Sequence, residues 1–376
     1  MGQEICAERL IVLGVISLII FILIFGLLIF VHELGHFAAA RRCGILVEEF
    51  AFGMGPKLVS WKPGETLFSI RLFPVGGFCS MHGMEDDSDS ERSFVVKSIP
   101  ARMFVILAGS AMNLGLALII FALGTLTSGF NTTTISNVLE GSPAESAGLL
   151  PGDQITGING STTHIYGDVL ISIRTSTTDT IGVDILREGT PHRIDITPGY
   201  NNGNRWIGVL PTYSLGAFQP RREGFERAGF VQSSVVGVQE MVFFIRHNFT
   251  VLGQIITGRA SMDMMTGPIG IFGIIDTNLQ STVANAELLE RSTSDTLLAI
   301  LRSNLAFAGM LSAAIGIFNL LPFPALDGGR FVFLTLEGVR RKPIKPETEG
   351  TIHFVGFAML MALAVFIAYR DVISLL

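Results

Sequence analysis

The chain is poor in charge and in cysteine. Only 15% of its 376 residues are charged, whereas a soluble protein carries roughly 25%. Its three cysteines, Cys6, Cys43 and Cys79, form no CxxC pair and suggest no disulfide framework. We expect reduced thiols at Cys43 and Cys79, which lie near basic residues. The formal net charge of −6 provides no basic patch, and we therefore expect no nucleic acid partner.

Apolar residues are instead abundant and gathered into runs. They make up 49% of the chain, and the mean hydropathy is +0.53. Four runs approach the roughly 20 residues that a helix needs to cross a hydrocarbon core: residues 10–31, 103–126, about 304–321, and 354–368 with its flanks. We therefore predict an α-helical polytopic membrane protein with four transmembrane helices in a lipid bilayer.

The flanking charges predict how these helices lie in the membrane. Glu4 and Glu8 precede the first run beside Arg9, which is the wrong charge for a signal peptide, so we interpret the run as a retained span. Basic residues are frequent in the connections between the first and second runs and between the third and fourth. The positive-inside rule places both connections in the cytoplasm and the long middle segment outside.

The first run leads directly into the motif His32-Glu33-Leu34-Gly35-His36. If the helix continues, His32 and His36 lie one turn apart on one face, where two imidazoles can share a Zn²⁺ ion. Glu33 points elsewhere and is free to act as a base on a water molecule. The other histidines have no partner at such a spacing and are predicted to be surface or turn residues: His82, His164, His192, His247 and His353.

A catalytic zinc site takes a third protein ligand, for which Asp327 is the best candidate. It follows Pro322 and Pro324, which must break the third apolar run, and a broken helix at membrane depth is tolerated only where it lines a cavity. The alternative is that Asp327 caps the next helix. Asn319, before the break, can stabilise an oxyanion or hold a substrate carbonyl, or else bond to another helix. Asn113 in the second run is interpreted as a helix-packing residue, with a role near substrate or metal as the alternative.

Two segments have the patterns of β-structure. Residues 47–81 alternate weakly between Gly and Pro breaks, which predicts short hairpins folded against the spans. Residues 134–211 predict a small β-rich domain with strands at residues 134–139, 154–158, 180–187 and 192–197. Residues 214–258 then have the apolar spacing of amphipathic helices.

Together these motifs and the domain between them resemble the site-2 protease family of intramembrane zinc metalloproteases, and more closely its bacterial regulator-of-sigma-E-protease branch. The resemblance covers nearly the whole chain. It implies that His32, His36 and Asp327 bind Zn²⁺, that Glu33 is the catalytic base, and that Asn319 positions the substrate.

The resemblance extends to two further segments. Residues 73–78 match a membrane-associated β-loop that pairs with unwound substrate, which implies substrate contacts at Gly76, Gly77 and Phe78. Residues 141–155 resemble a bacterial PDZ domain, which can bind a peptide or a C-terminal carboxylate. Many relatives have two such domains, and this chain shows one.

The expected organisation follows. We expect a first transmembrane helix with the zinc motif (1–44), a cytoplasmic-side, membrane-associated β region with an acidic connector (45–100), a second transmembrane helix (101–130), a PDZ domain (131–211), amphipathic linker helices (212–300), a third transmembrane segment with the Asn and Asp-Gly motif (301–340) and a fourth transmembrane helix (341–376).

The resemblance also implies a substrate and a location. The substrate would be a single-pass membrane protein, either an anti-sigma factor trimmed by another protease or a remnant signal peptide. The location would be the bacterial inner (cytoplasmic) membrane, with an extracytoplasmic PDZ domain and the active site toward the cytoplasm. Two rival hypotheses are a membrane-anchored zincin with a soluble catalytic domain, which lacks a suitable third ligand, and a non-catalytic PDZ scaffold, which has no use for Glu33.

Overall fold

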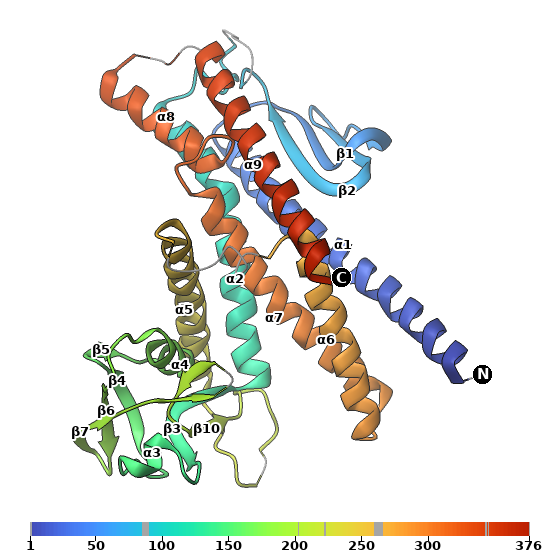
Figure 1. Ribbon diagram of the computed structural model, residues 1–376. Coiled ribbons are helices and arrows are strands. Elements are labelled where there is room, and N and C mark those ends of the chain that lie inside the picture. Colours follow the sequence, from blue (N-terminus) through green and yellow to red (C-terminus); the bar gives the residue numbers. More distant parts are fainter. Residues whose placement is uncertain are drawn as a thin grey trace. The chain divides into compact units, whose positions relative to one another are not determined.

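The computed structural model describes residues 2–84, 90–201, 203–221, 223–258, 266–342, 344 and 346–375. The chain forms two compact units, shown as ribbons in Figure 1. The first unit combines Met1–Ala117 with Asn248–Leu376, and the second is Leu118–His247. The second unit is therefore larger than the β-rich segment alone, because it takes in the end of one long helix and most of another.

Four of the described helices are long and apolar enough to cross a membrane. They lie within α1 (Gly2–Arg42), α2 (Ile99–Ser128), α7 (Thr293–Asn319) and α9 (Pro346–Leu375). The prediction of four apolar spans is confirmed, although α7 begins earlier and α9 is longer than the apolar runs indicated. Ser292 explains the early start of α7, because its side chain accepts a hydrogen bond from the Asp295 backbone N–H at 3.2 Å and caps the helix.

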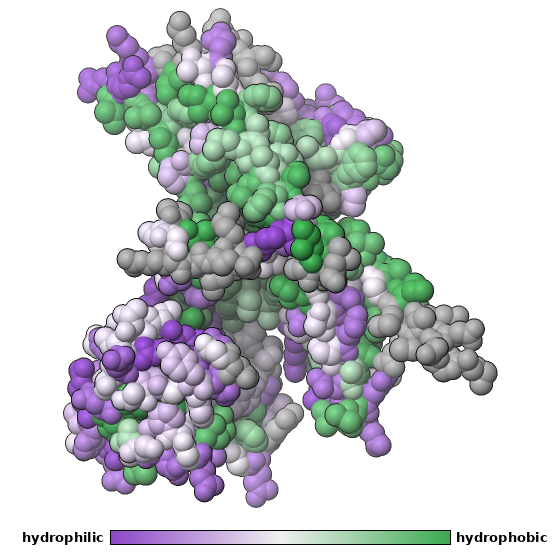
Figure 2. Space-filling view, viewed as in Figure 1, coloured by the Kyte–Doolittle hydropathy of each residue, from purple (hydrophilic) through white to green (hydrophobic). Residues whose placement is uncertain are grey.

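The surface of the first unit is consistent with contact with lipid. Large apolar side chains on α9 are exposed, including Phe354, Phe357 and Val365. Figure 2 shows hydrophobic colour over the helices of this unit and hydrophilic colour over much of the β-rich segment. An exposed apolar face of this length is stable where the surrounding solvent is itself apolar.

Residues 47–81 form β-structure folded against a span, as predicted, although two long bent strands take the place of several short hairpins. Strands β1 (Val47–Trp61) and β2 (Leu67–Met81) pair antiparallel, and both fold back on themselves. Phe50 pairs with Cys79 on one side and with Phe68 on the other. The end of β2, from Gly77 to Met81, therefore forms an edge of this small sheet, with β1 on one side only.

Two shorter helices complete the first unit. Helix α6 (Pro268–Leu288) has Gly267 at its N-cap position, and the Asp371 carboxylate of α9 accepts a hydrogen bond from the Gly270 backbone N–H at 2.8 Å. Helix α8 (Asp327–Arg340) follows α7 after an irregular connection. A buried cluster that includes Ala40, Val105 and Leu334 joins α1, α2 and α8 with the hairpin.

The second unit contains an antiparallel sheet of order β10-β3-β4-β6-β7, with β5 (Ser161–Thr162) beside β4. The strands are β3 (Phe130–Val138), β4 (Gln154–Ile158), β6 (Ile181–Arg187), β7 (Thr190–Ile196) and β10 (Val209–Ser214), and β8 (Gly199–Asn201) pairs with β9 (Asn204–Trp206). Four of these strands coincide with the predicted ones, whereas β10 and the helices α3 (Pro143–Ser146) and α4 (Tyr166–Thr175) were not predicted. Ile155, Val169 and Ile185 are among the side chains of the buried core. Helix α5 (Phe230–Ile256) follows.

Candidate metal centre

Helix α1 continues without a break through the histidine motif to Arg42. This continuity places His32 and His36 on adjacent turns of one face, and their Nε2 atoms are 3.2 Å apart. His36 is buried and its ring nitrogen Nδ1 lies 2.9 Å from the backbone oxygen of Val105 on α2. Because a carbonyl oxygen can only accept, Nδ1 is the protonated nitrogen, and the lone pair on Nε2 points at His32.

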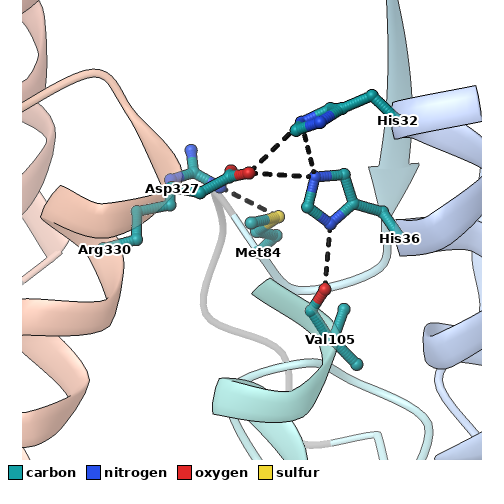
Figure 3. A network of polar contacts seen from close by, with 6 residues as sticks. All are labelled: His32, His36, Met84, Val105, Asp327 and Arg330. Atoms are coloured by element: carbon teal, nitrogen blue, oxygen red, sulfur yellow. Dashed lines mark hydrogen bonds and ion pairs between the residues drawn. The ribbon is translucent and has the colours of Figure 1, made fainter. Parts of the chain in front are cut away.

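Asp327 meets these histidines from the other end of the chain. Its Oδ2 atom lies 3.2 Å from His32 Nε2 and 3.4 Å from His36 Nε2, as Figure 3 shows. Asp327 is the first residue of α8, and the N-cap position is held by Leu326, which makes no side-chain cap. The alternative that Asp327 is the N-cap residue of this helix therefore has no support in the geometry.

The three donor atoms fit a zinc ion. They lie 3.2–3.4 Å apart, and ligands about 2.0–2.1 Å from a tetrahedral zinc are separated by roughly 3.3–3.4 Å. Without a cation, Asp327 Oδ2 is buried and has no hydrogen-bond partner among the described residues, and the same is true of His32 Nδ1. Two imidazoles and a carboxylate converging on one point are a donor set that zinc accepts.

The connection between α7 and α8 is strained where it holds Asp327 in place. Ala325 has a φ of 76°, a left-handed conformation that few residues other than glycine adopt. Its backbone N–H donates a hydrogen bond to Nδ1 of His353 on α9 at 2.8 Å. The prediction that His353 is a surface or turn residue is wrong, because its side chain is largely buried and supports this connection.

Glycines allow α2 to approach the histidines closely. A Cβ atom at Gly109 would collide with Nε2 of His36 and would lie 2.9 Å from Cε1 of His32. A Cβ atom at Gly35 would likewise collide with the backbone oxygen of Ala108. Small residues of α2 therefore pack against α1, and Gly109 packs against the two histidines of the candidate metal centre.

A cavity of about 680 Å³ opens beside the three donors. Glu33, Phe78 and Asn319 line it, so the structure brings these predicted residues to the same space as His32 and Asp327. Asn113 is fully buried, and it does not line this cavity. Its side-chain amide has no hydrogen-bond partner among the described residues.

The predicted β-loop residues lie on the edge of the hairpin that borders the cavity. A Cβ atom at Gly77 would lie 2.9 Å from the backbone oxygen of Ala51 and 3.5 Å from Cγ of Glu33, so a glycine brings this strand close to Glu33. Gly76 has a φ of 91°, which only glycine adopts readily. The ring of Phe78 is covered by the guanidinium of Arg71, whose Cζ is 4.8 Å from the ring centroid.

Sequence reasoning missed several residues of this cavity. Cys79, Glu48, His82 and Arg330 also line it. His82 lies in a turn, as predicted, and its Nδ1 is 2.7 Å from a Glu48 carboxylate oxygen. Burial and the nearby negative charge of Glu33 raise the pKa of the Cys79 thiol to about 12, so this thiol is neutral and unreactive at neutral pH. The position of Arg330 one turn after Asp327 was the signal in the sequence that could have revealed it.

The apolar spans and the two-histidine, one-aspartate site define a membrane-bound metallopeptidase. The family model of peptidase family M50 matches residues 20–363, and the chain belongs to this family. The predicted function, an intramembrane zinc metalloprotease, is confirmed at this level, and the rival hypothesis of a non-catalytic scaffold is not supported.

Related proteins are similar over almost their whole length. The chain is 35% identical to a putative zinc metalloprotease of Clostridium perfringens, over 94% of this chain and 97% of that protein. It is 29% identical to the regulator of sigma-W protease RasP of Bacillus subtilis, over 95% of this chain and 98% of that protein. Among solved structures, a PDZ domain of an SdrC-like protein from Listeria monocytogenes matches 22% of this chain and 88% of its own, with 20% identity and a TM-score of 0.20.

Proposed function

We propose that this protein hydrolyses peptide bonds within or next to the transmembrane segment of single-pass membrane proteins, with His32, His36 and Asp327 holding the zinc ion. The observation that carries the proposal is the meeting of donor atoms from α1 and α8 within 4.8 Å of one another, beside a cavity that also contains Glu33. Bound zinc would polarise the scissile carbonyl and lower the pKa of a water molecule toward 7.

Glu33 is the general base of this reaction. Its carboxylate takes a proton from the attacking water and passes it to the nitrogen of the leaving amine. A Cβ atom at Gly77 would lie 3.5 Å from Cγ of Glu33, so this strand passes within van der Waals contact of the Glu33 side chain. The Glu33 carboxylate therefore meets the substrate peptide at the strand edge.

The edge of β2 provides a place for the unwound substrate. A helical amide is shielded by its own hydrogen bonds, so the substrate must unwind before cleavage, and the freed N–H and C=O groups need partners in a medium with little water. The backbone from Gly76 to Phe78 can pair with an extended substrate by strand addition. Asn319, at the end of α7, can donate a hydrogen bond to the substrate carbonyl or to the developing oxyanion.

The domain at residues 131–211 is proposed to be a PDZ domain that binds a peptide or a protein C-terminus. Positive residues in the short connections support a topology with this domain outside the cytoplasm and the metal centre toward the cytoplasmic face. The similarity to the regulator of sigma-W protease RasP suggests an anti-sigma factor as substrate, with remnant signal peptides as the second candidate. The membrane in question would be the bacterial inner membrane.

One experiment tests the general base separately from metal binding. The purified full-length protein, loaded with zinc, is incubated with a fluorescent single-span substrate, and both cleavage and zinc content are measured for the wild type and Glu33→Gln. We expect Glu33→Gln to lose cleavage by at least about 100-fold while retaining zinc, and a chelator to stop the wild type. Glu65→Gln is the matched control, because Glu65 is an exposed carboxylate paired with Arg92. Full activity in Glu33→Gln would remove Glu33 from the mechanism.

A further inference from the structure

A cationic side chain, Arg330, lines the same cavity as the three donor residues. It lies one turn after Asp327 on α8, so both side chains project from one face of that helix. Figure 3 shows the Arg330 side chain extending toward Met84, which precedes the acidic connector. A positive charge therefore stands near the position at which we propose that the peptide bond is cleaved.

Arg330 has no anionic partner within the described part of the chain. Its Nη1 donates to the sulfur of Met84 at 3.2 Å, and a thioether is a weak acceptor. Three carboxylates also line the cavity. Asp327 lies against the histidines and Glu48 against His82, and Glu33, the proposed base, forms no ion pair with Arg330. The guanidinium therefore has further N–H groups that can donate hydrogen bonds to a ligand in the cavity.

Three other partly buried arginines in this protein have carboxylate partners. Arg71 is paired with Glu49, Arg102 with Glu337 and Arg187 with Asp153, each at 2.5–2.7 Å. A guanidinium withdrawn from water loses hydration, and it recovers most free energy from a carboxylate, whose two oxygens match its planar fork. Arg205 instead donates to backbone carbonyl oxygens, whereas Arg330 has only the Met84 sulfur among the described residues and faces a cavity.

We propose that Arg330 binds a carboxylate of the peptide in this cavity, an inference that rests on the proposed function. The carboxylate has two possible sources. One is an Asp or Glu side chain of the substrate close to the scissile bond. The other is the new C-terminal carboxylate, which forms when hydrolysis adds water across the C–N bond and releases an amine.

The membrane setting makes this contact selective. Placing an acidic side chain in the apolar interior of a membrane costs free energy. A guanidinium that pairs with this side chain offsets that cost, but only while the substrate is bound to the enzyme. Substrates with a suitably placed acidic residue would therefore be cleaved in preference to uniformly apolar spans. Arg330 would serve as a specificity-determining residue, and not as a group that acts on the reacting atoms.

The test uses synthetic leucine-rich spans of about 25 residues with a central Gly-Ala-Gly segment, made in pairs that carry Asp or Asn at the same position. Each position within about four residues of the centre is tested in turn with the zinc-loaded full chain. At one or more positions we expect the wild type to cleave the Asp span with kcat/KM about tenfold above that of the Asn span, as a charge-assisted hydrogen bond gives. A second arm compares inhibition by product peptides that end in a free carboxylate or in an amide.

Substitutions at Arg330 test whether its positive charge causes the preference for Asp spans over Asn spans. Arg330→Gln should equalise the members of each pair, and Arg330→Lys should keep part of the preference because lysine lacks the planar fork. Arg330→Glu should reverse it in favour of spans with Lys at the same position. Arg340→Gln is the matched control, because Arg340 is exposed at the far end of the same helix.

The outcomes separate this proposal from the proposed function. If the wild type shows no preference for either carboxylate source, or if Arg330→Gln slows Asp and Asn spans equally, the proposal is wrong, and an equal loss would indicate contact with a carbonyl common to all substrates. If the wild type cleaves no span in a zinc-dependent way, the proposed function fails. Equilibrium binding of the fluorescent Asp and Asn spans to Glu33→Gln protein, with and without Arg330→Gln, then still decides whether Arg330 recognises a carboxylate.

Discussion

The guanidinium of Arg102 on α2 donates two hydrogen bonds to the carboxylate of Glu337 on α8, at 2.5 and 3.1 Å. Both side chains are largely buried, with 9% and 17% exposed. Helix α8 begins at Asp327, so this pair fixes the helix that carries one of the three proposed metal ligands to the helix that contacts the other two.

Breaking this ion pair should weaken both the fold and the metal site. We expect Arg102→Ala to lower the free energy of unfolding by about 3–5 kcal/mol, because it leaves a buried carboxylate without a partner. Zinc affinity should fall with it, as α8 becomes less firmly held. Thermal melting of the zinc-loaded protein and titration with a competing chelator measure the two effects. The double variant Arg102→Met with Glu337→Leu should recover much of the stability, and equal damage in both variants would contradict the argument.

Gly109→Ala should reduce zinc content without harming helix α2. Alanine is the better helix former by about 1 kcal/mol, but its Cβ would collide with the His36 ring and press on His32. We expect displaced imidazoles and at least about a tenfold loss of zinc affinity, as follows when ligand orientation is disturbed. Gly115→Ala is the matched control on the same helix, because a Cβ atom there would meet nothing within 4 Å. Normal zinc content in Gly109→Ala would show that the close approach is unimportant.

Asp327→Asn should release zinc while leaving α8 intact. The substitution keeps the shape of the side chain and removes the negative charge that two imidazoles and a cation require. Because the N-cap position of this helix is Leu326 and no side chain caps the helix start among the described residues, helix content by circular dichroism should not change. Asp295→Asn, in the first turn of α7, is the control for charge near a helix N-terminus. Retention of one zinc per chain in Asp327→Asn would exclude this residue as a ligand.

The β1–β2 hairpin should lose stability in acid through Glu49. Burial acts to raise the pKa of Glu49, but hydrogen bonds from Ser69, Arg71 and Lys57 outweigh it and lower the pKa to about 2, from 4.5. A pKa lowered in the folded state contributes stability that is fully present above about 4.5 and is lost as the pH falls toward 2. The protection of the hairpin amides against hydrogen exchange, relative to the intrinsic rates at each pH, should therefore decrease between pH 5 and pH 3 in the wild type. Glu49→Gln should exchange faster at pH 5 and show a smaller acid effect, and an identical pH profile in the two proteins would refute the assignment.

The sequence predicted most reliably what depends on short-range spacing. His32 and His36 need only a continuous helix to share a face, and apolar length alone indicates four spans. Asp327 could be proposed because two histidines are an incomplete zinc site, an argument from chemistry and not from position. The roles of Asn319 and of the β-loop came from the resemblance to the bacterial branch of the family, and these roles remain proposals.

Long-range contacts could not be predicted in this way. The collision that makes Gly109 necessary depends on how closely α1 and α2 pack, and nothing in a run of small residues specifies which neighbour they meet. The doubled pairing of β1 and β2 arises from bends at glycines such as Gly53, where φ is 87°. Alternation in the sequence predicts strands but not where they turn back. His353 was misassigned for the same reason, since its partner, the Ala325 backbone, lies in a connection with no regular pattern.

The assembly of the donor set from the two ends of the chain has a consequence for biosynthesis. A ribosome delivers His32 and His36 early and Asp327 only after most of the polypeptide has been made. Until α8 emerges, the nascent protein holds two imidazoles and no carboxylate to complete the triad. Peptidase activity can therefore develop only after the hairpin, the middle domain and three of the four apolar helices have been synthesised. This order protects the nascent chain from self-cleavage.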